Sequence, residues 1–173
     1  MALILDATVG GQSSNAYLTR AEANAYFESR LYVTAWSGAT DANKDIAIAW
    51  ATRLLDRSID WRGYITSQQQ ALRWPRAYAF DADGVMILSN VIPPKVKEAT
   101  AELAIWLLRA DRTAETGREG IKSFSVGKIS FEFDKLDTAP TIPDAVYQLI
   151  ASLGSLNEVS GKGGVGTVEL VRT

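Results

Sequence analysis

The segment that decides the fold is IPPKVKEATAELAIWLLRA, residues 92–110. Two prolines at its start suit the first turn of a helix, where the missing backbone N–H has no partner to lose. Apolar side chains then keep helical spacing for five turns, at Val96, Ala99, Leu103, Trp106, Leu107 and Ala110. The spacing predicts a long helix with one apolar face, and Gly117 and Gly120 end any continuation.

Two helices are predicted before this segment. Thr19-Arg20-Ala21-Glu22 has the spacing of a capping box, so a helix should run from there to about Arg30. Asp41 is the candidate N-cap of a second helix, which should last to about Ile59. Its apolar face is predicted to contain Ile46, Trp50 and Leu54, widened by Ala47, Ala51 and Leu55.

Residues 60–91 are predicted to form a non-helical connector. Gly63, Pro75 and the turn sequence Asp81-Ala82-Asp83-Gly84 interrupt it. Since Pro75 disfavours the helical conformation of the residue before it, residues 72–74 should be extended. A connector of this length is expected to contain ordered structure of its own or to serve a function.

The pattern changes after residue 120. From about 121 to 134 apolar and polar residues alternate across Gly127-Lys128, which predicts a β-hairpin with one apolar face. A fourth helix follows from about Pro143 to Leu153, with Gly154 as its stop. The final stretch is glycine-rich up to Gly166, and residues 167–172 alternate like a short strand.

The expected fold is therefore mainly α: a bundle of about four helices with an inserted β-hairpin and an extended C-terminal tail ending in a short strand. We expect residues 1–158 to form the helical domain and residues 159–173 to form a flexible, Gly-rich tail. A chain of 173 residues suits one such domain better than two.

Composition excludes several classes of chemistry. The chain contains neither cysteine nor histidine, so disulfides, thiolate nucleophiles, zinc fingers and imidazole bases are absent. With 18 basic and 20 acidic residues the formal charge is −2, which predicts no bulk attraction to nucleic acid or lipid. The start lacks the pattern of a signal peptide, and no apolar run is long enough to cross a membrane. We expect a soluble protein made in a cytoplasm.

No catalytic, cofactor or metal site is predicted. The tail glycines lack the order and context of a phosphate-binding loop, because Lys162 lies between them and a strand follows. Asp81 and Asp83 begin like a calcium loop, but its later ligand positions hold Val85, Ile87 and Ser89 and no Glu closes it, so a turn is favoured. The chain is therefore not expected to be an enzyme.

A cluster of arginines and aromatic residues spans residues 53–76 and carries a local charge of +3. Aromatic rings that stack on bases, beside arginines that meet phosphates, are what a single-strand binding surface needs. In the alternative interpretation, which we favour from the residues alone, the tryptophans anchor the core and the arginines pair with carboxylates or a neighbouring subunit. The candidate nucleic-acid residues are Arg53, Arg57, Trp61, Arg62 and Trp74, with Tyr64 interleaved.

Other features favour protein partners. An unpaired apolar strand on a flexible tether can complete the sheet of another subunit, or it can fold back on its own hairpin. The candidate interface residues are Arg73, Trp74 and Arg76 of the connector, Lys122 and Lys128 of the hairpin, and Val168, Leu170 and Arg172 of the tail.

Several motifs resemble one family of small tailed-bacteriophage proteins, over roughly residues 13–155. These motifs are Trp61-Arg62-Gly63, Gln70-Ala71-Leu72-Arg73-Trp74-Pro75-Arg76, the Asp83-Gly84 turn and Ile92-Pro93-Pro94-Lys95-Val96-Lys97-Glu98-Ala99, supported by Tyr17-Leu18-Thr19 and Ser125-Val126-Gly127-Lys128-Ile129-Ser130. Members are often named DnaT-like single-stranded DNA-binding proteins, and they are similar to head-to-tail adaptors (connector proteins).

The resemblance implies a structural virion protein. It implies a homo-oligomeric ring of twelve copies in the neck, bound to the portal protein above and to a neck or tail completion protein below. Genomic DNA would pass through its channel without sequence-specific binding, and neither a membrane nor a cofactor would be involved. The alternative is a single-stranded DNA-binding protein that uses residues 53–76.

Overall fold

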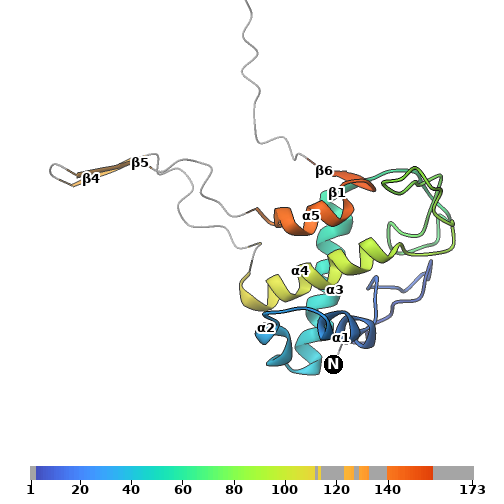
Figure 1. Ribbon diagram of the computed structural model, residues 1–173, viewed down its shortest axis with the longest axis horizontal. Coiled ribbons are helices and arrows are strands. Elements are labelled where there is room, and N and C mark those ends of the chain that lie inside the picture. The colour runs from blue at the N-terminus through green and yellow to red at the C-terminus, as the bar shows by residue number, and fades with distance from the viewer. Residues whose placement is uncertain (1–2, 112, 114–122, 127–128, 133–139, 158–173) are drawn as a thin grey trace, which may run out of the picture.

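Five helices occupy the described part of the chain in the computed structural model, which describes residues 3–111, 113, 123–126, 129–132 and 140–157. Figure 1 shows four of them gathered around the central helix α4. Their bounds are α1 Arg20–Glu28, α2 Thr34–Ser37, α3 Asp41–Ser58, α4 Pro94–Arg109 and α5 Asp144–Ile150. The prediction of a mainly helical fold is confirmed at this level, and the tail beyond residue 157 lies outside the described residues.

Helix α4 forms the centre of the core, as its sequence predicts. It packs against α3 on one side and α5 on another. Val96, Ala99 and Leu103 are completely buried, whereas Trp106 and Leu107 near its end are half-buried. Each large apolar side chain that α4 buries contributes about 1.5–3 kcal/mol to stability.

The predicted start of α1 is confirmed. The Thr19 side chain accepts from the backbone N–H of Glu22, and the Glu22 carboxylate accepts in return from the backbone N–H of Thr19. The helix ends at Glu28, two residues earlier than expected. Helix α3 is capped by Thr40 rather than Asp41, because the Thr40 hydroxyl accepts from the Asn43 backbone N–H.

The buried face of α3 differs from the predicted one. Ile46 is 53% exposed and Trp50 is 37% exposed, although both were expected to lie in the core. The buried arc is displaced toward Ile48 and Thr52, since the Thr52 hydroxyl donates to the Ile48 carbonyl and accepts from the Tyr17 backbone N–H. Ile46 and Trp50 therefore lie at the edge of the contact with α4.

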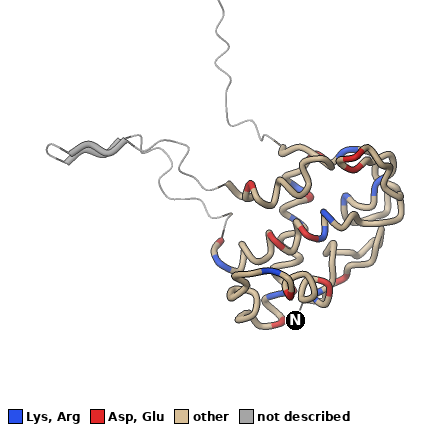
Figure 2. The backbone as a smooth tube through the Cα atoms, viewed as in Figure 1, with Lys and Arg blue, Asp and Glu red and all other residues tan. Residues whose placement is uncertain are grey.

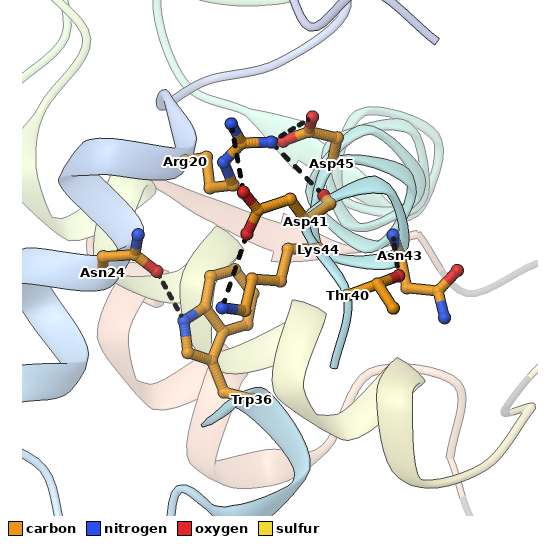
Figure 3. Close-up of polar contacts among 8 residues, drawn as sticks. All are labelled: Arg20, Asn24, Trp36, Thr40, Asp41, Asn43, Lys44 and Asp45. Carbon is orange, nitrogen blue, oxygen red and sulfur yellow. Dashed lines mark hydrogen bonds and ion pairs between the residues drawn. The ribbon is translucent and has the colours of Figure 1, made fainter. Parts of the chain in front are cut away.

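Short helix α2 was not predicted. It places Trp36 in the core, where the indole ring lies 4.7 Å from the Phe27 ring and its N–H donates to the Asn24 side chain. Figure 3 shows the hydrogen bond between Trp36 and Asn24 beside the start of α3. Four residues are too few for a periodic signal, so no pattern in the sequence predicts this helix.

Three small antiparallel sheets complete the described structure. Strand β1 (Ile59–Trp61) pairs with β6 (Gly154–Leu156), and β2 (Tyr64–Ile65) pairs with β3 (Arg76–Ala77). The predicted hairpin is confirmed in its pairing of β4 (Ser123–Val126) with β5 (Ile129–Glu132). Lys122 and Lys128 lie outside the described residues.

Gly154 starts β6 rather than simply stopping a helix. A Cβ atom at this position would lie 2.6 Å from the Ile59 side chain and 2.8 Å from the Asp60 carbonyl oxygen. The β1–β6 pair thus requires glycine here, because no side chain fits between the two strands.

The connector contains ordered structure, as its length predicts. Residues 72 and 73 form bends rather than the expected extended segment. The turn at Asp81 is confirmed: its carboxylate accepts from the backbone N–H groups of Asp83 and Val85, and Gly84 adopts φ +77°. These hydrogen bonds give the Asp81 carboxylate the role of a turn residue.

Candidate nucleic-acid interface

The two connector tryptophans form a buried anchor. Trp74 is 1% exposed, and the Trp61 ring packs against it edge to face, with ring centroids 5.8 Å apart. Neither ring has a free face for a base, so both are wrong as stacking residues. Their burial supports the alternative interpretation, in which they hold the connector on the core.

Arg76 is also structural rather than an exposed contact residue. Its buried guanidinium donates to the carbonyl oxygens of Arg62 at 2.7 Å, Gly63 at 2.6 Å, Trp61 at 3.1 Å and Arg73 at 3.2 Å. Desolvation lowers the pKa of this guanidinium from its usual value. Arg76 therefore clamps the turn between β1 and β2, which corrects its prediction as an interface residue.

The clamped turn approaches the following strand closely. Gly63 has φ +75°, and a Cβ atom there would lie 2.4 Å from the Ala77 carbonyl oxygen. Only glycine permits this approach. The close contact, together with the Arg76 hydrogen bonds, fixes the position of β2 relative to β3.

Two exposed tyrosines lie next to the turn that Gly63 and Arg76 hold in position. Tyr64, in β2, is 72% exposed, and Tyr78, just after β3, is 70% exposed. Their ring centroids are 6.4 Å apart at an interplanar angle of 79°. Exposed aromatic rings of this kind can stack on nucleic-acid bases of any sequence.

Tyr78 was missed by the sequence analysis. Its proximity to Tyr64 depends on the β2–β3 register, in which Tyr64 lies opposite Ala77, and on the positive φ of 55° at Tyr78. Neither feature has a local sequence signal. Only the interleaving of Tyr64 with arginines pointed to this surface.

Four arginines near the connector are exposed and form no salt bridge with a carboxylate within the described residues, although Arg73 lies close enough to Asp56 for their charges to attract. They are Arg53, Arg57, Arg62 and Arg73. The Arg53 guanidinium stacks 5.3 Å above the Trp50 ring, and Arg62 donates to the Ser152 carbonyl oxygen at 3.0 Å. The expected pairing of these arginines with helix carboxylates is thus not found in the described part of the chain.

Several other basic residues in the described part of the chain form ion pairs with carboxylates. Arg20 lies 2.7 Å from Asp45 and 3.6 Å from Asp41, and Lys44 lies 3.8 Å from Asp41, as Figure 3 shows. Three further ion pairs, Arg30–Glu102, Lys95–Glu98 and Lys97–Glu22, lie on α1 and α4. Figure 2 shows basic positions in the connector as well, at the right of the view. Among the described residues, Arg109 at the end of α4 is likewise exposed without a salt bridge, and its guanidinium donates to the Tyr32 carbonyl oxygen.

The half-buried carboxylate of Asp56, in α3, contacts the backbone of Arg73. Asp56 accepts from the Arg73 backbone N–H at 3.1 Å and from the hydroxyl of buried Tyr17. Desolvation raises the pKa of Asp56 above its usual value, and desolvation together with Asp56 raises that of Tyr17. The contact ties the connector to α3 and to the segment before α1.

Removing the Tyr17 hydroxyl should therefore destabilise the protein. In Tyr17→Phe the half-buried Asp56 loses a donor, which costs about 1–3 kcal/mol at neutral pH. A raised folded-state pKa favours protonated Asp56, so the loss should shrink as pH falls toward the unfolded value of about 3.9. Urea denaturation at pH 7 and near pH 4.5 measures this difference. Tyr32→Phe, at an exposed tyrosine, serves as the control, and an equal loss at both pH values would contradict the interpretation.

Comparison with known proteins gives one match. A family model described as "Putative DnaT-like ssDNA binding protein" matches residues 1–173, the whole chain. The chain belongs to this family. No curated protein and no solved structure matches the chain.

Membership in the DnaT-like family decides between two predictions. The predicted head-to-tail adaptor function is contradicted, because the family description names single-stranded DNA binding, which was the alternative. The family is not enzymatic, in agreement with the expectation from the sequence. The predicted portal, neck and self partners and the virion location are tested by neither the family nor the fold, and they stay predictions.

The described residues hold no helix with the length and apolar character of a membrane span. Within the same residues, acidic side chains form no group of three or more that could hold a metal ion. Val168, Leu170 and Arg172, predicted to contact a partner, lie outside the described part of the chain.

Proposed function

We propose that this member of the DnaT-like family binds single-stranded DNA through its connector face, defined here as Tyr64, Tyr78, Arg62 and Arg73. The observation that carries the proposal is the exposed tyrosine pair on a turn whose neighbouring arginines, Arg62 and Arg73, are exposed and form no salt bridge in the described structure. The family description supports the same activity.

The tyrosines and the arginines would contact different parts of the DNA strand. Bases stack on the tyrosine rings, and stacking on an aromatic side chain contributes about 1–3 kcal/mol per base. The arginines meet phosphates and release counterions, which adds affinity without sequence preference. Since the chain carries a formal charge of −2, attraction to DNA must come from this local surface rather than from the whole molecule.

Rigidity favours binding at this face. The buried tryptophan pair and the Arg76 hydrogen bonds hold the turn before Tyr64 in one conformation. A platform that is ordered before the ligand arrives loses less conformational entropy on binding. The buried tryptophans thus contribute to the site by positioning the tyrosines, although they do not contact the strand.

A titration with a fluorescently labelled oligothymidylate tests the proposal. Fluorescence anisotropy should show binding at low salt, and the affinity should fall linearly with the logarithm of salt concentration. Each single-strand phosphate contact contributes about −0.7 to that slope, so Arg62→Gln combined with Arg73→Gln should reduce its magnitude by about 1.4.

Lys95→Gln provides a matched control, because it removes a positive charge that already pairs with Glu98 on α4. Its slope and affinity should stay close to those of the unmodified protein. If no complex forms at micromolar protein and low salt, or if the double arginine variant binds unchanged, the connector face is not a DNA site.

A further inference from the structure

A concave surface lies between the first half of α3 and the end of α4, away from the connector face. It is a groove of about 500 Å³. Its walls are apolar, with polar groups at one end: Ile46, Trp50, Leu107 and Leu108, together with Asn43 and Asp111. The volume falls in the range of sites that enclose one small organic group. Ile46 and Trp50, the exposed large apolar residues of α3, both line this groove.

Two arginines of α3 lie between this groove and the start of the connector. Trp50, Arg53 and Arg57 are spaced i, i+3 and i+7, so they lie on one side of the helix. The strip from Trp50 to Arg57 is about 10 Å long. Helix α3 ends at Ser58, and Arg62 of the connector face follows β1 directly.

The groove also carries groups suited to a nucleobase. The Trp50 indole offers an aromatic surface, and the Arg53 guanidinium lies 5.3 Å from its ring centroid. The Asn43 side chain can both donate and accept a hydrogen bond, which suits the mixed donors and acceptors on a base edge. A base entering here would place its phosphate near Arg53.

We propose that the groove receives one base of the same DNA strand that binds the connector face. This inference rests on the proposed function, and it extends the binding path along Arg53 and Arg57 to Trp50. A second copy of the chain is a poorer occupant, because it would desolvate Arg53 and Arg57, which have no carboxylate partner in the described structure.

Length-dependent binding tests the path. Labelled oligothymidylates of about 5 and about 15 nucleotides cover the range of known single-strand sites. With Trp50→Ala, affinity for the longer strand should fall about 5- to 100-fold, while affinity for the shorter strand should change less than about twofold. Trp50→Phe keeps an aromatic ring and should recover most of the loss.

Tyr32→Ala is the matched control, since Tyr32 is an aromatic residue 84% exposed outside both surfaces. Its affinity for either strand should equal that of the unmodified protein. If Trp50→Ala binds the longer strand with unchanged affinity while the unmodified protein binds both, the groove is not part of the path and the connector face still stands. If the unmodified protein binds neither strand, both proposals fail.

Light scattering without DNA tests whether a second copy of the chain, rather than a base, occupies the groove. A protein that is dimeric as the unmodified chain and monomeric as Trp50→Ala would assign the groove to contact between copies and overturn the proposal. The expected result is the same mass for both proteins. Trp50→Phe and Trp50→Ala should unfold at similar temperatures, because Trp50 lies at the edge of the core. Similar unfolding temperatures support the interpretation that the loss of affinity comes from the groove itself rather than from unfolding.

Discussion

Replacing Arg76 by methionine is expected to lower the free energy of unfolding by about 3–5 kcal/mol. Methionine keeps much of the apolar stem but removes all the donors, so the carbonyl oxygens of residues 61, 62, 63 and 73 lose their partner. Each buried acceptor left without a hydrogen bond costs about 1–3 kcal/mol. Partial hydration of the opened turn keeps the total below the sum of these costs.

Urea denaturation followed by far-UV circular dichroism measures the loss. Arg53→Met is the matched control, because Arg53 is exposed and its replacement should change stability by less than about 0.5 kcal/mol. Arg76→Lys should fall between the two, since an ammonium group cannot match the planar fork of a guanidinium. Arg76→Met within about 1 kcal/mol of the unmodified protein would show that the clamp is not a major source of stability.

The parts of the fold that were predicted correctly carry strong local signals. The capping residues Thr19 and Glu22, the apolar spacing of α4 and the turn at Asp81 each depend on residues a few positions apart. The alternation around residues 123–132 likewise predicted the β4–β5 pairing. Local hydrogen bonds and periodic burial predict these elements without any knowledge of long-range contacts.

The parts that were missed depend on long-range contacts. Strand β6 pairs with β1, which lies almost a hundred residues earlier in the chain, and no local pattern in residues 154–156 predicts a strand. The face of α3 was predicted too far toward Ile46 and Trp50, because six apolar positions fit more than one orientation of the helix. The buried Thr52, which bonds to the segment before α1, decides the orientation, and its role is not visible in hydropathy.

The candidate site shows the same division. The sequence pointed to residues 53–76, because arginines and aromatic residues alternate there, but it could not sort exposed from buried members. Trp74 and Arg76 carry the residue types of a binding surface yet form the interior of the connector. The exposed aromatic surface comes from Tyr64 and Tyr78, which the β2–β3 pairing brings together.

Removing both exposed rings should have the largest effect on DNA binding. The combined change of Tyr64→Ala and Tyr78→Ala is expected to weaken binding of a labelled oligothymidylate by about 2–4 kcal/mol, or about 30- to 1,000-fold. The loss should stay below twice the single-ring maximum, because the two rings contact each other and their contributions are coupled.

Stability should change little in the same variant, since both rings are about 70% exposed and neither belongs to the core. Tyr64→Phe with Tyr78→Phe keeps the stacking surfaces and should retain most of the affinity. Loss of affinity in the phenylalanine variant would instead assign binding to the hydroxyl groups. Affinity within about twofold of the unmodified protein in the alanine variant would remove the tyrosine pair from the site. Because the arginines would remain, the salt dependence of that residual binding should be nearly unchanged, which separates the contribution of stacking from that of phosphate contacts.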